Sequence, residues 1–352
     1  MIVNLPAGKI PVYDTIVSGG DSSGNAQVAL SFVGAGPSLP YAWGNNGAPG
    51  GTTLVWMGEP GGTMWKHAGG AYPKWEGMTF QMDPGNEQIT DARRRRAVED
   101  GYPLDEDWRI FDGSRSAGIG LQIHGDNQKG GVTQSPYLSR VCIIGSRDID
   151  IKNTPRFTIG LYISAGDSGH AQVDNIVADS LEVRDVFIGV YSYNWQAVCN
   201  EIRHGKLDAR YAALLLRRGS MNVHDTQFNI RSDNGSAIVV GEEAAYLRVR
   251  DSYCEMPTAA SFMKVGGTDT QRHHNFLGNI VIDGGRFNHQ YPDGGALPIV
   301  EGEWEGTVTM TNCDLKTSIH RSAEDAWFTI PSAVKQMWNN VWSRTELRVI
   351  NE

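Results

Sequence analysis

Acidic and basic residues recur next to each other in three similar stretches of the sequence. These stretches are IDIKNTPRFTIGLYI (149–163), LEVRDVFIGVY (181–191) and LDARYAALLL (207–216). Each one opens with an apolar residue, an acid, an apolar residue and a base. Side chains alternate between the two faces of a β-strand. If the apolar residues point inward, the acids and bases therefore point outward.

Equivalent outward residues form columns if these stretches stack as strands about 4.8 Å apart. The expected acidic column is Asp150, Glu182, Asp208, Asn229 and Glu255, and the expected basic column is Lys152, Arg184, Arg210 and Arg231. Carboxylates one strand apart would be separated by about 5 Å, and those two strands apart by about 10 Å. Both separations are close to those of the carboxylate pairs that cleave glycosidic bonds.

These columns predict a glycan-cleaving site around Asp208. In a lyase, Arg or Lys neutralises a uronate carboxylate while a base removes the neighbouring proton. The predicted catalytic residues are Glu182, Asp208, Arg210, Lys206 and His204, and the predicted ligand-binding residues on the same face are Arg184, Arg231 and Glu255. An acidic column beside a basic one also stabilises stacked strands, although exposed ion pairs contribute only about 0–1 kcal/mol. Both interpretations stay open.

Aromatic residues supply a second kind of binding candidate. The sequence contains 10 Trp, and Tyr193 and Trp195 end the stretch GVYSYNWQ beside the Glu182 and Asp208 segments. Aromatic rings stack on sugars, so Tyr193 and Trp195 are predicted to bind ligand. The alternative is that such rings pack loops onto the fold or fill an oligomer interface.

The elements that must position these residues are short strands in a repeat. MNVHDTQFNI (221–230), YLRVRDSYCEM (246–256), NIVIDGGRFNH (279–289) and TVTMTNCDLKT (307–317) share apolar positions on either side of a small turn. The first positions are Val223, Val249, Ile282 and Met310, and the second are Phe228, Cys254, Phe287 and Leu315. One such unit cannot bury its apolar face alone, whereas stacked units can. The pattern predicts an all-β, right-handed parallel β-helix rather than a sandwich or a propeller.

The opening segments resemble a known superfamily. VNLPAGKIPVYDTIV, VALSFVGAGPS and TTLVWMGEPGG are similar to the first coils of pectate-lyase-like β-helices, although Lys9 and Ile10 depart from the usual pattern. That superfamily includes polysaccharide lyases, glycoside hydrolases, phage tailspikes and non-catalytic members. The helical cap that normally precedes the first coil is missing. Because the start of a β-helix is an open sheet edge, the start is expected to be trimmed or covered by another chain or domain.

Two segments depart from the repeat. A charged stretch that includes DARRRRAVED is expected to form an excursion at about 83–118, solvated or between subunits. The β-helix is expected to span 1–320, followed by a cap or oligomerisation segment at 321–352. In that segment, PSAVKQMWNNVW (331–342) has helical apolar spacing and TELRVINE returns to a strand pattern. The resemblance to tailspikes implies a homotrimer.

Composition excludes several function classes. The net charge of −9 argues against a nucleic-acid partner, and no apolar run is long enough for membrane insertion. The four cysteines are expected to be free and buried, and no metal or cofactor is predicted, since nothing indicates a Ca²⁺ ion. No secretory signal is visible in the sequence. From the resemblance to tailspikes we nevertheless expect an extracellular or virion location, with virion proteins as candidate partners at the N-terminus.

The sequence therefore predicts a polysaccharide-recognising, tailspike-like depolymerase acting by lyase or hydrolase chemistry. The alternatives are a secreted bacterial lyase or hydrolase and a non-catalytic virion or adhesive β-helix.

Overall fold

The computed structural model describes most of the chain between residues 1 and 350. The described residues are 1–19, 29–37, 41–42, 45–46, 51–83, 116–125, 132–145, 158–165, 172–194, 196–231, 235–257, 260–266, 278–290, 300–302, 307–317, 328–329, 335–343 and 349–350. Asp150, Lys152, Trp195 and most of the expected excursion lie outside these residues.

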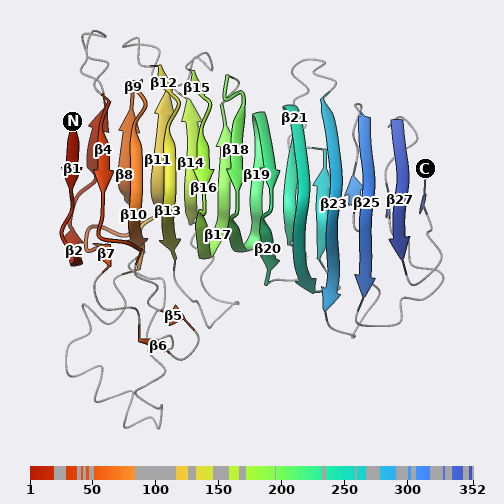
Figure 1. Cartoon of the computed structure of the whole chain (residues 1–352), viewed down its shortest axis with the longest axis horizontal. Coiled ribbons are helices and arrows are strands. Elements are labelled where there is room, and N and C mark those ends of the chain that lie inside the picture. Colours follow the sequence, from red (N-terminus) through yellow and green to blue (C-terminus); the bar gives the residue numbers. More distant parts are fainter. Residues whose placement is uncertain are drawn as a thin grey trace.

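The described chain is all-β, and its strands stack side by side along the long axis of the molecule (Figure 1). Three ladders of parallel strands run along this axis. We call them the first, second and third faces. Every pairing among the described strands is parallel except that of β5 (Tyr41–Ala42) with β6 (Asn45–Asn46). This arrangement is β-helix-like, because each coil contributes a strand to each face.

The strands of each face follow one another in chain order. The first face contains β1 (Ile2–Asn4), β4 (Ser31–Val33), the start of β10 (Lys74–Gln81), β13 (Tyr137–Ile144), β16 (Val177–Asp179) and β18 (Asn200–Arg203). It continues through the end of β19 (Lys206–His224) into the middle of β21 (Ser236–Pro257) and the starts of β23 (Asn279–Gln290), β25 (Thr307–Thr317) and β27 (Lys335–Ser343).

The second and third faces are built in the same way. The second contains β2 (Gly8–Val12), β7 (Thr52–Trp56), the start of β17 (Glu182–Tyr193), β20 (Gln227–Ile230) and parts of the longer strands. The third contains β3 (Ile16–Gly19), β8 (Thr63–Ala68), β11 (Ile119–Gly125), β14 (Ile159–Ala165), β22 (Ser261–Val265), β24 (Val300–Gly302), β26 (Phe328–Thr329) and β28 (Val349–Ile350), together with parts of β17, β19 and β21. A small ladder joins β9 (Gly70–Ala71), β12 (Thr133–Gln134) and β15 (Val173–Asp174).

The register confirms both predicted apolar columns. On the first face Val223 pairs with Val249, Val249 pairs with Ile282, and Ile282 pairs with Met310. On the second face the column is Phe228, Cys254, Phe287 and Leu315. Aromatic rings fill the space between the faces, and the centroids of Phe262 and Phe287 are 4.2 Å apart. Stacked positions of this kind give the solenoid one continuous core.

A single left-handed residue turns the chain at the corner between the first and second faces. In the coils from β10 to β25 these corner residues are Gly77, Arg140, Ser180, His204, Asp225, Asp251, Gly284 and Asn312. Their φ angles lie between 47° and 72°. Gly, Asn and Asp tolerate this conformation best, and the corner resets which side chains point outward.

Two expectations are corrected. The segment 335–343 is strand β27, paired with β25, and not part of a helix. Trp338 pairs with Met310 and Val341 pairs with Cys313. Two residues three positions apart therefore each align with a buried residue of β25, because the strand turns a corner between them. All four cysteines are free, but Cys199 is exposed, whereas Cys142, Cys254 and Cys313 are buried. No helix in the described segments is long and apolar enough to cross a membrane.

Candidate functional site

A β-bulge near the start of β17 shapes the outer surface of the second face. Glu182 pairs with Lys206, and the register then shifts between Val183 and Val186. Within this bulge Asp185 has a left-handed φ of 54°. Bulges redirect side chains and are common next to functional sites, and a left-handed Asp carries a small strain cost. The bulge turns Asp185 towards the following coils.

Asp185 and Asp208 are joined by one guanidinium group. Arg231 Nη1 donates to Asp185 Oδ1 at 3.0 Å, and Nη2 donates to Asp208 Oδ2. The Asp208 side chain is 3% exposed and that of Asp185 is 9%, whereas that of Arg231 is 42% exposed. Burial acts to lower the pKa of Arg231, but the two carboxylates outweigh it and raise that pKa above its usual value. The pair is therefore held by a cation that faces solvent.

Asp208 has a polar atom that the described protein does not satisfy. Its Oδ1 is buried and has no hydrogen-bond partner among the described residues. Leaving a buried acceptor unpaired costs about 1–3 kcal/mol, and native proteins keep few such atoms. An unsatisfied, buried carboxylate oxygen beside a β-bulge in the neighbouring strand is a candidate contact for a ligand.

The predicted acidic column is confirmed for Asp208, Asn229 and Glu255, is wrong for Glu182, and is not tested for Asp150, which lies outside the described residues. Asp208 pairs with Asn229, which pairs with Glu255. Glu182 instead pairs with Lys206. The corner is the physical reason, because Glu182 and Lys206 each lie two residues after a left-handed corner residue, Ser180 or His204. The bulge then inserts residues into β17 after Val183, and Asp185 contacts the same guanidinium group as Asp208. The sequence reasoning therefore missed Asp185, although the acid directly after Arg184 was a visible break in the alternation.

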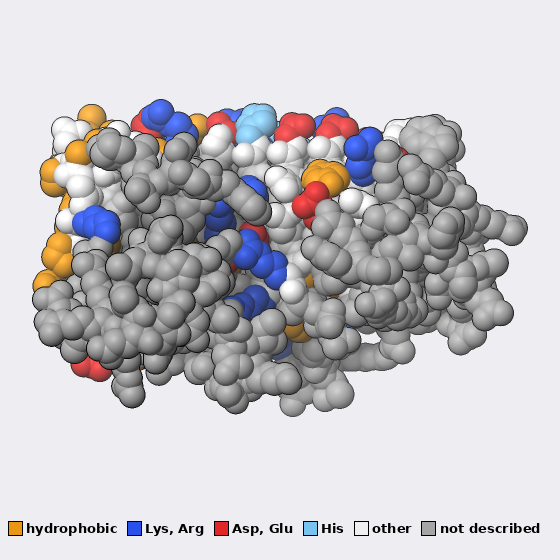
Figure 2. Space-filling view, turned by 90° about the horizontal axis from the view of Figure 1, so that it is seen from below, with side chains coloured by type: hydrophobic (Ala, Val, Ile, Leu, Met, Phe, Trp, Pro, Cys, Tyr) orange, Lys and Arg blue, Asp and Glu red, His pale blue; other side chains and the backbone are white. Residues whose placement is uncertain are grey.

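Other predicted residues lie around this pair on the second face. Arg184 forms an ion pair with Glu182, and both side chains are about one-fifth exposed. Tyr253 donates to Glu255 Oε1 at 2.6 Å. Arg210 is partly buried, two residues after Asp208 on β19. Figure 2 shows Lys and Arg side chains gathered in the middle of the molecule as seen from below, the side on which β17 begins and β20 ends in Figure 1.

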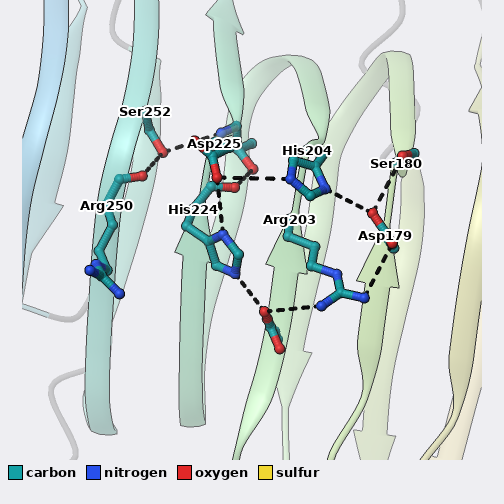
Figure 3. Close-up of polar contacts among 10 residues, drawn as sticks. Asp179, Ser180, Arg203, His204, His224, Asp225, Arg250 and Ser252 are labelled. Carbon is teal, nitrogen blue, oxygen red and sulfur yellow. Dashed lines mark hydrogen bonds and ion pairs between the residues drawn. The ribbon is translucent and has the colours of Figure 1, made fainter.

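His204 does not join the Asp208 site, which corrects the prediction. It is a left-handed corner residue, and its Nδ1 lies 3.0 Å from Asp179 Oδ1, on the outer edge of the first face (Figure 3). The corner separates the first face from the second. His204 therefore contacts Asp179 on the first face, although it lies only two positions before Lys206. Tyr193 lies on the third face, where Ser164 is its register partner.

His204 belongs to a second polar group, the histidine cluster, which is defined as Asp179, Glu201, Arg203, His204, His224 and Asp225. Arg203 Nη2 lies 3.2 Å from Asp179 Oδ2, and His224 Nε2 lies 2.5 Å from Glu201 Oε1. A hydrogen bond with His204 is the main cause that lowers the pKa of Asp179. Members of the cluster contact one another across successive coils (Figure 3), so the cluster links neighbouring strands by ion pairs and hydrogen bonds.

The described residues contain no group of three or more His, Cys, Asp or Glu arranged to hold a metal ion. The sequence matches no protein-family model and no curated protein. Solved structures do match in fold.

One matching structure is the catalytic domain of a GH87 alpha-1,3-glucanase D1069A variant in complex with tetrasaccharides. The identity is 12%, the TM-score is 0.53, and the match covers 97% of this chain but only 54% of the glucanase chain, about half its length. Another is DFA-IIIase from Arthrobacter chlorophenolicus A6 without its lid, in complex with GF2. Here the identity is 9%, the TM-score is 0.50 and the coverage is 99% and 88%. The chain therefore shares the β-helix-like fold of carbohydrate-active catalytic domains.

Proposed function

We propose that this protein is a right-handed parallel β-helix that binds a polysaccharide and cleaves its glycosidic bonds at the Asp185–Asp208 pair. The observation that carries the proposal is the pair itself: two adjacent carboxylates on one exposed guanidinium, with Asp208 Oδ1 buried and unsatisfied. The fold shared with a glucanase domain supports the same substrate class.

The chemistry that two such carboxylates supply is glycoside hydrolysis. One carboxylic acid protonates the leaving glycosidic oxygen, and the other carboxylate either activates a water or attacks the anomeric carbon itself. The bond from the anomeric carbon to the leaving oxygen breaks, and a bond to the water oxygen replaces it. Arg231 holds both carboxylates until substrate enters.

Lyase chemistry is the second candidate, favoured by the cations of the same face. Arg184 and Arg231 lie beside the acids, and Arg is suited to neutralising a uronate carboxylate. The two reactions leave different products, since a lyase product carries a carbon–carbon double bond that absorbs ultraviolet light and a hydrolase product does not.

The tailspike-like role is part of this proposal. Strands β1, β2 and β3 pair on one side only among the described strands. Met1, Ile2, Tyr13 and Val17 are 62–73% exposed there. An apolar, unpaired edge suits a covering polypeptide, whether an adjoining segment of the same protein or another protein. A homotrimer and a virion or extracellular location follow from the same proposal.

The test is incubation with a panel of neutral and acidic polysaccharides, followed by assays for new reducing ends and for ultraviolet absorbance. Asp208→Asn should lower kcat on the cleaved glycan by at least about 100-fold, the usual effect of an acid–base group. The matched control is Asp314→Asn on the same face, whose exposed carboxylate pairs with Arg286 at 3.4 Å. Equal activity of Asp208→Asn and wild type would overturn the assignment. Binding without cleavage would favour the non-catalytic alternative.

A further inference from the structure

The third face carries a group of outward aromatic residues that starts beside the acid pair. Tyr162 on β14 pairs in register with Tyr191 on β17, and their rings stack with centroids 5.0 Å apart and planes at 14°. The ring of Tyr193, two residues along, lies 6.0 Å from that of Tyr191. All three side chains are partly exposed. They therefore form one continuous aromatic surface.

A second stacked pair lies closer in sequence to the candidate active site, with Phe187 on the same strand β17. Phe187 and Tyr211 have ring centroids 5.2 Å apart and planes at 6°, and both are partly exposed. Phe187 is two residues after Asp185, and Tyr211 is three residues after Asp208. The five aromatic residues, which we call the aromatic strip, are Phe187, Tyr211, Tyr162, Tyr191 and Tyr193.

The strip is held in place before any ligand arrives. The guanidinium carbons of Arg218 and Arg217 lie 4.2 Å and 5.2 Å from the centroid of the Tyr193 ring, within the range of cation–π attraction. Preordered rings lose little conformational entropy when they bind.

Sugar rings match this chemistry. Their C–H faces pack on aromatic rings, and their hydroxyl groups hydrogen-bond to phenols and guanidinium groups. A protein partner would also use aromatic and Arg side chains. Three of the five rings, however, follow one strand, β17, from two residues after Asp185 to Tyr193, and β14 and β19 on either side each add one stacked ring, which favours a linear chain over a broad protein interface.

We propose that the aromatic strip binds several consecutive sugar residues of a polysaccharide that extends from the Asp185–Asp208 pair across the third face. The proposal rests on the proposed function for the class of ligand. Asp185 and Tyr193 are separated by eight residue steps on β17, which is at most about 26 Å of strand. The strip therefore selects long chains over short ones.

The test measures binding separately from cleavage. The ligands are oligosaccharides of increasing length, cut from whichever polysaccharide of the panel binds the wild type, and Asp208→Asn protein is used where the wild type cleaves them. Isothermal titration calorimetry should show affinity rising with chain length. Tyr191→Ala and Tyr193→Ala should each weaken binding of long oligosaccharides about three- to tenfold and leave the shortest unchanged. Tyr191→Phe should retain most of the affinity.

Tyr137→Ala is the matched control, because Tyr137 is partly exposed on the first face under its own cation, with Lys74 Nζ 5.6 Å from the ring centroid. It should bind every oligosaccharide like wild type. Unchanged long-chain affinity in both third-face variants would overturn the proposal, and so would an equal loss in Tyr137→Ala or the absence of binding to any polysaccharide. Self-association lost in Tyr193→Ala, measured by sedimentation, would assign the strip to an interface between copies instead. A wild type that binds but never cleaves would refute the proposed function and leave this result intact.

Discussion

At the residue scale, the most informative group outside the site is a buried histidine in the first coils. His67 is 1% exposed, its Nδ1 lies 3.0 Å from Ser18 Oγ, and its ring stands edge-on to Trp75 at 5.2 Å. Burial lowers its pKa to about 4, and a backbone contact with Gly69 offsets this only in part. The folded protein therefore keeps His67 neutral where an unfolded chain would protonate it.

This histidine predicts a specific loss of stability in mild acid. Between pH 6.5 and pH 4 the unfolded chain binds a proton that the folded protein does not, so the free energy of unfolding falls as the pH falls. The total effect is about 3 kcal/mol, most of it present by pH 4 and complete only below the pKa of the folded protein. Urea unfolding of wild type and His67→Leu at pH 7 and pH 5 measures it. The wild type should lose about 2 kcal/mol more than the variant, and parallel losses would contradict the assignment.

At the element scale, the left-handed corner decides which side chains reach which face. The sequence alternation predicted Asp208, Asn229 and Glu255 correctly because they lie on unbroken strands of one face. It failed for His204 and Glu182, because a left-handed corner residue resets the alternation and the register, and it missed Asp185, because of the bulge in β17. Neither feature has a fixed sequence signature here, since corner residues include Arg, Ser and His as well as Gly and Asp.

The corner conformation predicts an unequal response to two substitutions. Asp251 has a φ of 47°, so Asp251→Val should lower the free energy of unfolding by about 1–2 kcal/mol, while Asp251→Gly should change it much less. Arg250→Val, one residue earlier on the strand, serves as the control and should have a smaller effect than Asp251→Val. Urea denaturation provides the measurement. Equal destabilisation by the Val and Gly variants at position 251 would argue against a left-handed corner.

At the scale of the whole molecule, the repeat of apolar positions was enough to predict an all-β stack, because a unit of this size buries its apolar face only against its neighbours. The apolar spacing at 331–342 wrongly indicated a helix, since apolar residues three apart suit both a helix and a strand that turns a corner. The third-face strip was missed except for Tyr193, because its residues come from separate coils, 29 positions apart for Tyr162 and Tyr191.

A solenoid also predicts graded protection along its axis. Strands in the middle, such as β19, pair on both sides, whereas β1 pairs with β4 alone among the described strands (Figure 1). Hydrogen exchange followed by mass spectrometry should show the slowest exchange in 206–224 and faster exchange in 2–19, since local opening costs least at an open edge. Protection of the first coil equal to that of β19 would mean that another polypeptide covers it in the sample.

The account depends most on cleavage at the acid pair. Its most direct test is the kcat of Asp208→Asn relative to Asp314→Asn on the polysaccharide that the wild type degrades, with both variants shown to be folded. We predict a loss of at least about 100-fold for Asp208→Asn and near wild-type turnover for Asp314→Asn. Equal turnover in the two variants would contradict the account and move the chemistry away from Asp185 and Asp208.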